Sequence, residues 1–180
     1  MALDKYTIGQ RYGTALFDLA TEQGTVDTVF ADVMALQQVF ADTPTLGSVL
    51  TNATLTLEQK QPILTSLQQG ATVSVKNLLQ MVFDYGRMNE MPFILAAFVQ
   101  RYDQVNGIVH AKVTSAVPLT SEQQQALSTQ LATRLGAKQI EIKNTVDETV
   151  IGGLIVEANN LVIDGSIRKR LAQVQQLLLG

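Results

Sequence analysis

The sequence lacks cysteine and tryptophan, and it contains a single histidine, His110. Without cysteine the chain forms no disulfide bond and offers no thiolate as a nucleophile or metal ligand. One histidine leaves little material for histidine-dependent catalysis or for a histidine metal site. The composition therefore argues against most nucleophilic and metal-dependent enzymes. We expect no catalytic residue, no metal ligand and no cofactor.

Long apolar runs and basic clusters are missing as well. No run approaches the roughly 20 apolar residues that span a bilayer, so we expect no transmembrane segment. The first residues lack the pattern of a secretory signal or a transit peptide, so we expect no leader. The formal net charge is −3, with 13 Lys and Arg against 16 Asp and Glu. Because nucleic-acid binders usually carry a clustered basic face, we expect no nucleic-acid partner.

Hydrophobic residues make up 46% of the 180 residues, which is enough to build one large core or two small ones. Up to residue 106, apolar residues recur every three or four positions, the spacing of amphipathic helices. This spacing predicts six helices, of which the fourth begins at the capping box Thr56 to Gln59. They cover residues 5–22, 26–40, a short segment beginning at Thr43-Pro44, 57–69, 73–85, and a segment from about residue 89. Six helices in this length indicate a compact bundle.

The hydrophobic period changes from about 3.6 residues to about 2 at Asn106-Gly107. Alternation then predicts strands over residues 108–115 and 140–146, and a hairpin of 153–158 with 161–164 around the turn Asn159-Asn160. Helices are predicted over residues 121–135 and from Ser166 onward, the latter with Ile167, Leu171, Val174 and Leu178 on one face. The predicted fold class is therefore α+β. A six-helix bundle (residues 1–106) precedes a small domain (107–180) with a short sheet and two helices.

Three groups of residues invite a catalytic interpretation. Ser166 and Lys169 have the Ser-x-x-Lys spacing of penicillin-recognising enzymes, but the companion motifs are absent, and a helix cap explains Ser166 better. Asp147 and Glu148 are adjacent acids before a predicted strand, which is typical of a solvated turn. His110 has no Asp, Glu or second His at ligand spacing, which favours a surface position. The sequence also contains neither a Walker A motif nor a dinucleotide glycine fingerprint.

Four motifs follow one another along the whole chain. They are Ile8-Gly-Gln-Arg-Tyr-Gly-Thr-Ala-Leu-Phe-Asp-Leu-Ala20, Tyr85-Gly-Arg87, Ser115-Ala-Val-Pro-Leu-Thr120, and the segment from Ile151-Gly-Gly-Leu to Val162-Ile-Asp-Gly-Ser-Ile-Arg168. In this order they resemble the delta subunit of the bacterial F-type ATP synthase, a relative of the mitochondrial oligomycin-sensitivity-conferring protein. The resemblance implies a stator subunit without catalytic activity of its own. It also implies a peripheral location at the cytoplasmic face of the bacterial cell membrane, as part of that complex.

The resemblance further implies two partners. In this family the amino-terminal bundle caps the catalytic F1 hexamer and receives the amino-terminal helix of an alpha subunit between its first and fifth helices. The carboxy-terminal domain engages the b subunits of the peripheral stalk. The candidate partner-binding residues of this chain are Tyr12, Ala15, Leu16, Leu79, Val82 and Phe83. Each of these could equally face the core, because apolar residues at helical spacing usually point inward.

Glycines and polar residues of the last motif are expected to have a structural role, in a turn or in close backbone packing. They are Gly152, Gly153, Asp164, Gly165 and Ser166. Composition and periodicity also fit a second class of protein, a helical adaptor that binds amphipathic peptide helices. Only the identity of the partner separates this alternative from a stator subunit.

Overall fold

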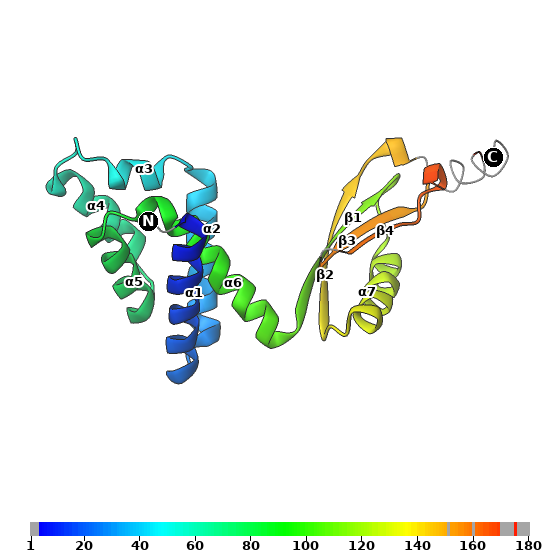
Figure 1. Cartoon of the computed structure of the whole chain (residues 1–180), viewed down its shortest axis with the longest axis horizontal. Helices are drawn as coiled ribbons and strands as arrows, with labels where there is room; N and C mark the ends of the chain where they lie inside the picture. The colour runs from blue at the N-terminus through cyan, green and yellow to red at the C-terminus, as the bar shows by residue number, and fades with distance from the viewer. Residues whose placement is uncertain (1–3, 151, 160, 170–174, 176–180) are drawn as a thin grey trace. The chain divides into compact units, whose positions relative to one another are not determined.

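The computed structural model describes residues 4–150, 152–159, 161–169 and 175 (Figure 1). The chain separates into two compact units, Met1–Tyr102 and Asp103–Gly180. Each unit has its own cluster of buried apolar side chains. The first unit is helical and the second combines helix with sheet, so the predicted α+β class is confirmed.

Six α-helices and one 3₁₀ turn form the helical part. They are α1 (Lys5–Glu22), α2 (Val26–Asp42), α3 (Leu46–Thr51), α4 (Leu57–Gln68), α5 (Val73–Asp84), η1 (Met88–Glu90) and α6 (Met91–Asn106). The capping box predicted at the start of α4 is present, because the backbone N–H of Thr56 donates to Oε1 of Gln59 at 3.0 Å. Pro44 does not begin α3 as predicted. It occupies a turn closed by the 3.0 Å hydrogen bond from Leu46 N to Thr43 O, a position that proline favours because its φ is fixed.

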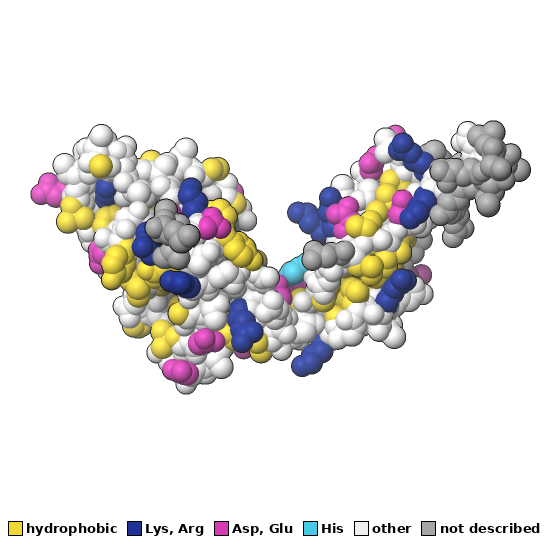
Figure 2. Space-filling model, viewed as in Figure 1, with side chains coloured by type: hydrophobic (Ala, Val, Ile, Leu, Met, Phe, Trp, Pro, Cys, Tyr) yellow, Lys and Arg dark blue, Asp and Glu magenta, His cyan; other side chains and the backbone are white. Residues whose placement is uncertain are grey.

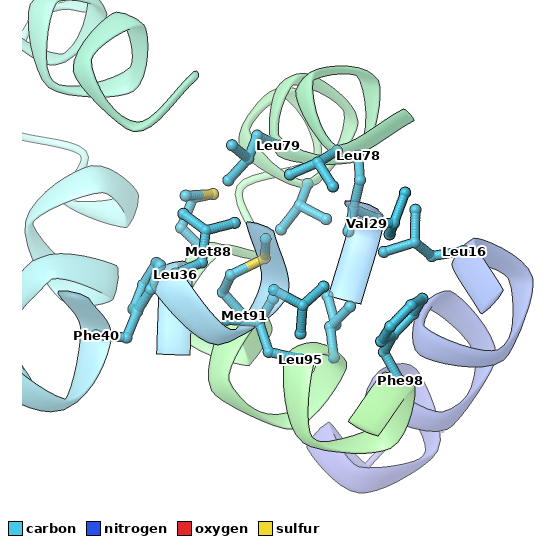
Figure 3. Close-up of a cluster of buried hydrophobic side chains, with 14 of the residues drawn as sticks. Leu16, Val29, Leu36, Phe40, Leu78, Leu79, Met88, Met91, Leu95 and Phe98 are labelled. Atoms are coloured by element: carbon cyan, nitrogen blue, oxygen red, sulfur yellow. The ribbon is translucent and has the colours of Figure 1, made fainter. Parts of the chain in front are cut away.

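The core of the bundle draws large apolar side chains from all the long helices (Figure 3). Phe17 of α1 and Phe98 of α6 pack edge to face, with ring centroids 5.7 Å apart. α1 approaches α6 closely because Gly9 and Gly13 face it. A Cβ atom at residue 13 would lie 2.6 Å from the carbonyl oxygen of Ile94. The two glycines of the opening motif therefore set the distance between these helices.

The second unit contains a four-stranded sheet in the order β2-β1-β3-β4. Its elements are β1 (Ile108–Ser115), α7 (Ser121–Leu135), β2 (Gln139–Val146), the 3₁₀ turn η2 (Glu148–Val150), β3 (Leu154–Ala158) and β4 (Leu161–Asp164). β1 and β2 are parallel and joined by α7, as a crossover connection requires, while β3 pairs antiparallel with both β1 and β4. The predicted hairpin is present, with Asn159 at φ 46° in its two-residue turn.

Alternation along β1 separates the two faces of the sheet. Val109, Ala111 and Val113 are buried and pack in one cluster with Leu131 of α7, whereas His110 and Lys112 are exposed on the other face. The second predicted helix of this unit is described only at its start, where residues 167–169 are helical. The predicted positions Leu171, Val174 and Leu178 lie outside the described residues.

Candidate partner-binding groove

A surface groove with a volume of about 390 Å³ runs between α1 and α5. Its lining is mostly apolar and consists of Ile8, Arg11, Tyr12, Ala15, Leu16, Leu19, Ser74, Asn77, Leu78, Met81 and Arg87. The α1 residues in this set are spaced by three or four positions, so they form one stripe along that helix. The two helices are antiparallel, because Tyr12 contacts Arg87 at one end of the groove and Gln23 contacts Ser74 at the other.

The groove has a buried floor and a more exposed apolar rim. Leu16 and Leu78 form part of the floor and are almost fully buried. On the rim, Leu19 and Met81 are 39% and 43% exposed. A rim of this kind beside a buried floor leaves apolar surface for an amphipathic helix to cover.

The structure brings the three α1 candidates together in this groove but separates the three α5 candidates from it. Tyr12, Ala15 and Leu16 all line the groove. Leu79 and Val82 are fully buried in the core of the bundle, with exposed fractions of 0%.

Phe83 packs partly against the core and lines a separate pocket near Leu50 and Leu57. On α5 the groove is formed instead by Ser74, Asn77, Leu78 and Met81. Nothing in the geometry places Leu79, Val82 or Phe83 where an occupant of the groove would touch them.

The end of α5 brings a basic residue into the groove. Gly86 has φ 63°, and the backbone N–H groups of Gly86 and Arg87 donate to the carbonyls of Phe83 and Val82 at 2.9 Å. This is the Schellman pattern that ends a helix at a glycine. The chain then turns so that the Arg87 Nη1 lies 3.4 Å from the Tyr12 hydroxyl oxygen. The Tyr85-Gly-Arg87 motif therefore closes one end of the groove.

In the second unit, the residues predicted to be structural form one close-packed junction between β3, β4 and the following helix. Gly153 has φ 80°, and a Cβ there would overlap the carbonyl oxygen of Gly165. The backbone N–H of Gly165 donates to Leu154 O at 2.9 Å, and that of Ile167 donates to Gly152 O at 3.0 Å. Only glycine combines this φ with this backbone contact.

Two carboxylates stabilise turns on either side of this junction. The Asp164 Oδ1 accepts a hydrogen bond from Ser166 N at 3.0 Å, and this contact to Ser166 lowers the pKa of Asp164 below its ordinary value of 3.8. Hydrogen bonds from the hydroxyl and backbone N–H of Thr149 lower the pKa of Asp147 in the same way. Both acids are therefore ionised hydrogen-bond acceptors of the local backbone.

The catalytic interpretation of Ser166 finds no support in its surroundings. Ser166 is 3% exposed, and its Oγ accepts a hydrogen bond from the backbone N–H of Lys169 at 3.2 Å. This is the geometry of a helix N-cap. The hydroxyl therefore serves the helix start, as the sequence predicts.

His110 is exposed as predicted, but it has carboxylate neighbours that sequence spacing did not indicate. Its two ring nitrogens lie 2.9 Å from Asp103 Oδ2 of α6 and 3.2 Å from Glu141 Oε2 of β2. Within the described residues, no group of three or more histidine or acidic side chains is arranged to hold a metal ion. Of the helices in the described part of the chain, none combines the length and hydrophobicity that crossing a bilayer requires.

Comparison with known proteins gives a consistent result. Residues 8–178 match the family described as ATP synthase delta (OSCP) subunit. The chain is 44% identical to the ATP synthase subunit delta of Latilactobacillus sakei and 38% identical to that of Enterococcus faecalis, covering 99% of both chains in each case. Its fold is also similar to a chain in the cryo-EM structure of the Toxoplasma gondii mitochondrial ATP synthase hexamer. That match has a TM-score of 0.70 and 19% identity, and it covers 97% of this chain and 98% of the other.

Proposed function

The chain belongs to the ATP synthase delta (OSCP) subunit family, and from this membership we propose that it is a stator subunit linking the F1 catalytic hexamer to the peripheral stalk. In this role it couples proton flow to ATP synthesis without catalysing either step. It reaches the cytoplasmic face of the cell membrane through the complex. The proposal assigns one partner to each unit of the chain.

The observation that carries the proposal is the apolar groove between α1 and α5. An amphipathic helix binds by placing an apolar stripe into a cleft whose rim is also apolar. The groove offers a floor that includes Leu16 and Leu78 and a rim that includes Leu19 and Met81. We assign to it the amino-terminal helix of an alpha subunit, because the family resemblance of the whole chain implies an alpha-binding site between the first and fifth helices.

The second unit is assigned to the b subunits of the stalk. It has its own core and a sheet covered on one face by α7, so it can hold a partner independently of the first unit. A stator needs two such binding units joined by a continuous chain, because torque from the rotor must pass between the two partners. The segment from α6 to β1 supplies this covalent connection.

A helical adaptor that binds peptide helices would use the same groove. The family match favours the stator, because it extends over residues 8–178 and thus includes the second unit, which an adaptor bundle does not need. The catalytic interpretation of Ser166 and Lys169 loses its motivation because Ser166 is a buried helix cap.

Reconstitution tests the proposal. Membranes stripped of this subunit should hydrolyse ATP but pump few protons, and adding back the full chain should restore pumping that is driven by ATP. The control is the rate of ATP hydrolysis per hexamer in membranes with and without the chain. This rate should change little because the chain supplies no catalytic group. Full proton pumping without the chain, or no restoration by the folded chain, would contradict the stator assignment.

A further inference from the structure

We propose that one end of the α1–α5 groove is an acid-selective site, which accepts a partner helix only when carboxylates border its apolar stripe. This inference rests on the proposed function and specifies the chemistry of the partner. The site consists of Arg11 from α1 and Arg87 from the segment after α5, which line the groove together with Tyr12 and Met81.

Arg87 is held in the groove with most of its hydrogen-bonding capacity unused. The side chain is half-buried, its Nη1 lies 3.4 Å from the Tyr12 hydroxyl oxygen, and its guanidinium carbon lies 5.8 Å from the centre of the Tyr85 ring. Both contacts fix the position of the guanidinium group. Neither neutralises its charge, and among the described residues no acceptor occupies the remaining N–H donors, so they can bind a planar acceptor such as a carboxylate.

Among the described residues that line the groove there is no competing acid. Its lining residues include two arginines and neither Asp nor Glu. No ion pair among the described residues involves Arg11 or Arg87. The excess of basic residues in the groove lining differs from the chain as a whole, in which acidic residues outnumber basic ones by 16 to 13. In Figure 2, apolar and basic side chains lie next to one another on the face where Figure 1 places α1 and α5.

The positive charge of Arg87 affects binding once a helix occupies the groove. A helix seated on Leu16 and Leu78 would remove water from around Arg87, and a buried guanidinium without an acceptor is costly. A glutamate or aspartate beside the apolar stripe would replace the lost water with a bidentate hydrogen bond. A helix with the same apolar stripe but with neutral or basic flanks would leave Arg87 unpaired. The groove therefore selects by charge as well as by shape.

Titration calorimetry on the full chain tests this inference with two peptides. The first is the amino-terminal segment of the cognate alpha subunit, and the second is the same segment with every Glu and Asp changed to Gln and Asn. The variants are Arg87→Gln and Arg87→Lys, with Lys76→Gln as the control, because Lys76 is an exposed cation of α5 that does not line the groove. Thermal unfolding checks that each variant is folded.

The wild-type chain should bind the acidic peptide about tenfold more tightly than the amide peptide, which corresponds to about 1.4 kcal/mol. Arg87→Gln should abolish this difference, Arg87→Lys should retain part of it, and Lys76→Gln should leave it unchanged. The difference should also shrink at high salt. Equal binding of both peptides, or strong binding of a natural segment without carboxylates, would overturn the acid selectivity and leave the proposed function intact. If neither peptide binds the folded wild-type chain, the assignment of the groove itself fails.

Discussion

Replacing Gly153 by alanine should destabilise the second unit strongly, because two separate penalties meet at this position. The first is conformational. Residue 153 has φ 80°, and placing a non-glycine residue in the left-handed region costs about 1–2 kcal/mol. The second is steric, because the new Cβ would overlap the backbone of Gly165. Displacing packed backbone costs about 1–3 kcal/mol, so the free energy of unfolding should fall by about 2–5 kcal/mol.

The chain offers a matched control for the conformational penalty alone. Gly136 ends α7 with φ 64°, and a Cβ there would have no neighbour within 4 Å. Gly136→Ala should therefore cost only about 1–2 kcal/mol. The two variants lie in the same unit. The difference between their losses in free energy of unfolding therefore measures the steric penalty at residue 153, where the strand-to-helix junction packs closely.

The two units can be followed separately in denaturant unfolding of the full chain. All four tyrosines precede residue 103 and there is no tryptophan, so intrinsic fluorescence reports on the first unit alone, whereas far-ultraviolet circular dichroism reports on both. Gly153→Ala should shift a circular dichroism transition to lower denaturant while the tyrosine transition stays in place. If Gly153→Ala and Gly136→Ala shift the transition equally, the packing argument is refuted. If the tyrosine signal moves as well, the two cores are not independent.

Three further predictions concern other parts of the chain. Gly13→Ala should lower the free energy of unfolding measured by tyrosine fluorescence by about 1–3 kcal/mol despite the better helix propensity of alanine, because a Cβ would meet the α6 backbone, whereas the exposed Asp18→Ala should not. The folded-state pKa of Asp164 is lowered, so its contribution to stability should be complete above pH 3.8 and lost as the pH falls through the lowered value. The stability difference between wild type and Asp164→Asn should shrink in that acid range. A difference that stays constant would contradict the downward shift of the Asp164 pKa. Cleavage at an engineered protease site next to Gly107 should leave ATP hydrolysis by membranes intact but reduce proton pumping, and retained pumping would show that the chain connection carries no torque.

Much of the fold could be predicted because local signals agreed with one another. The change from helical to strand periodicity at Gly107, the capping box at Thr56, and the paired asparagines of the hairpin each have one dominant structural solution. Pro44 was misplaced because proline favours both the first turn of a helix and the second position of a β-turn. The hydrogen bond that decides between these positions joins Thr43 to Leu46 and has no signature in the sequence.

The α1 candidates line the groove and the α5 candidates do not, and the reason lies in how each helix is buried. The stripe of α1 that contains Tyr12 lines one side of the groove. α5 is buried on a broad face. Leu79 points into the core (Figure 3), and Val82 is buried in the same cluster. The groove lies at the edge of that face, where Ser74 and Asn77 interrupt the apolar pattern. When candidates on α5 are chosen for their hydrophobicity alone, the choice therefore falls on core residues and not on the residues at the rim of the groove.

Contacts between distant elements could not be predicted from one sequence. The Tyr12 hydroxyl meets Arg87, although 75 positions separate them in the chain. In the second unit, His110 meets Asp103 of α6 and Glu141 of the neighbouring strand. These pairs depend on how helices and strands pack, which periodicity does not encode.

Calorimetric titration of the full chain with the amino-terminal peptide of the cognate alpha subunit tests the central claim most directly, when it is repeated with Ala15→Asp. Ala15 is an exposed residue that lines the groove, so aspartate there should be tolerated by the fold but should place a charge against the apolar stripe of the peptide. Ala35→Asp, a change at another exposed alanine that lies on α2 outside the groove, is the control. We predict one-to-one binding that Ala15→Asp weakens at least about tenfold and Ala35→Asp leaves unchanged. Binding that is indifferent to Ala15→Asp, or absent from the folded wild-type chain, would contradict the account.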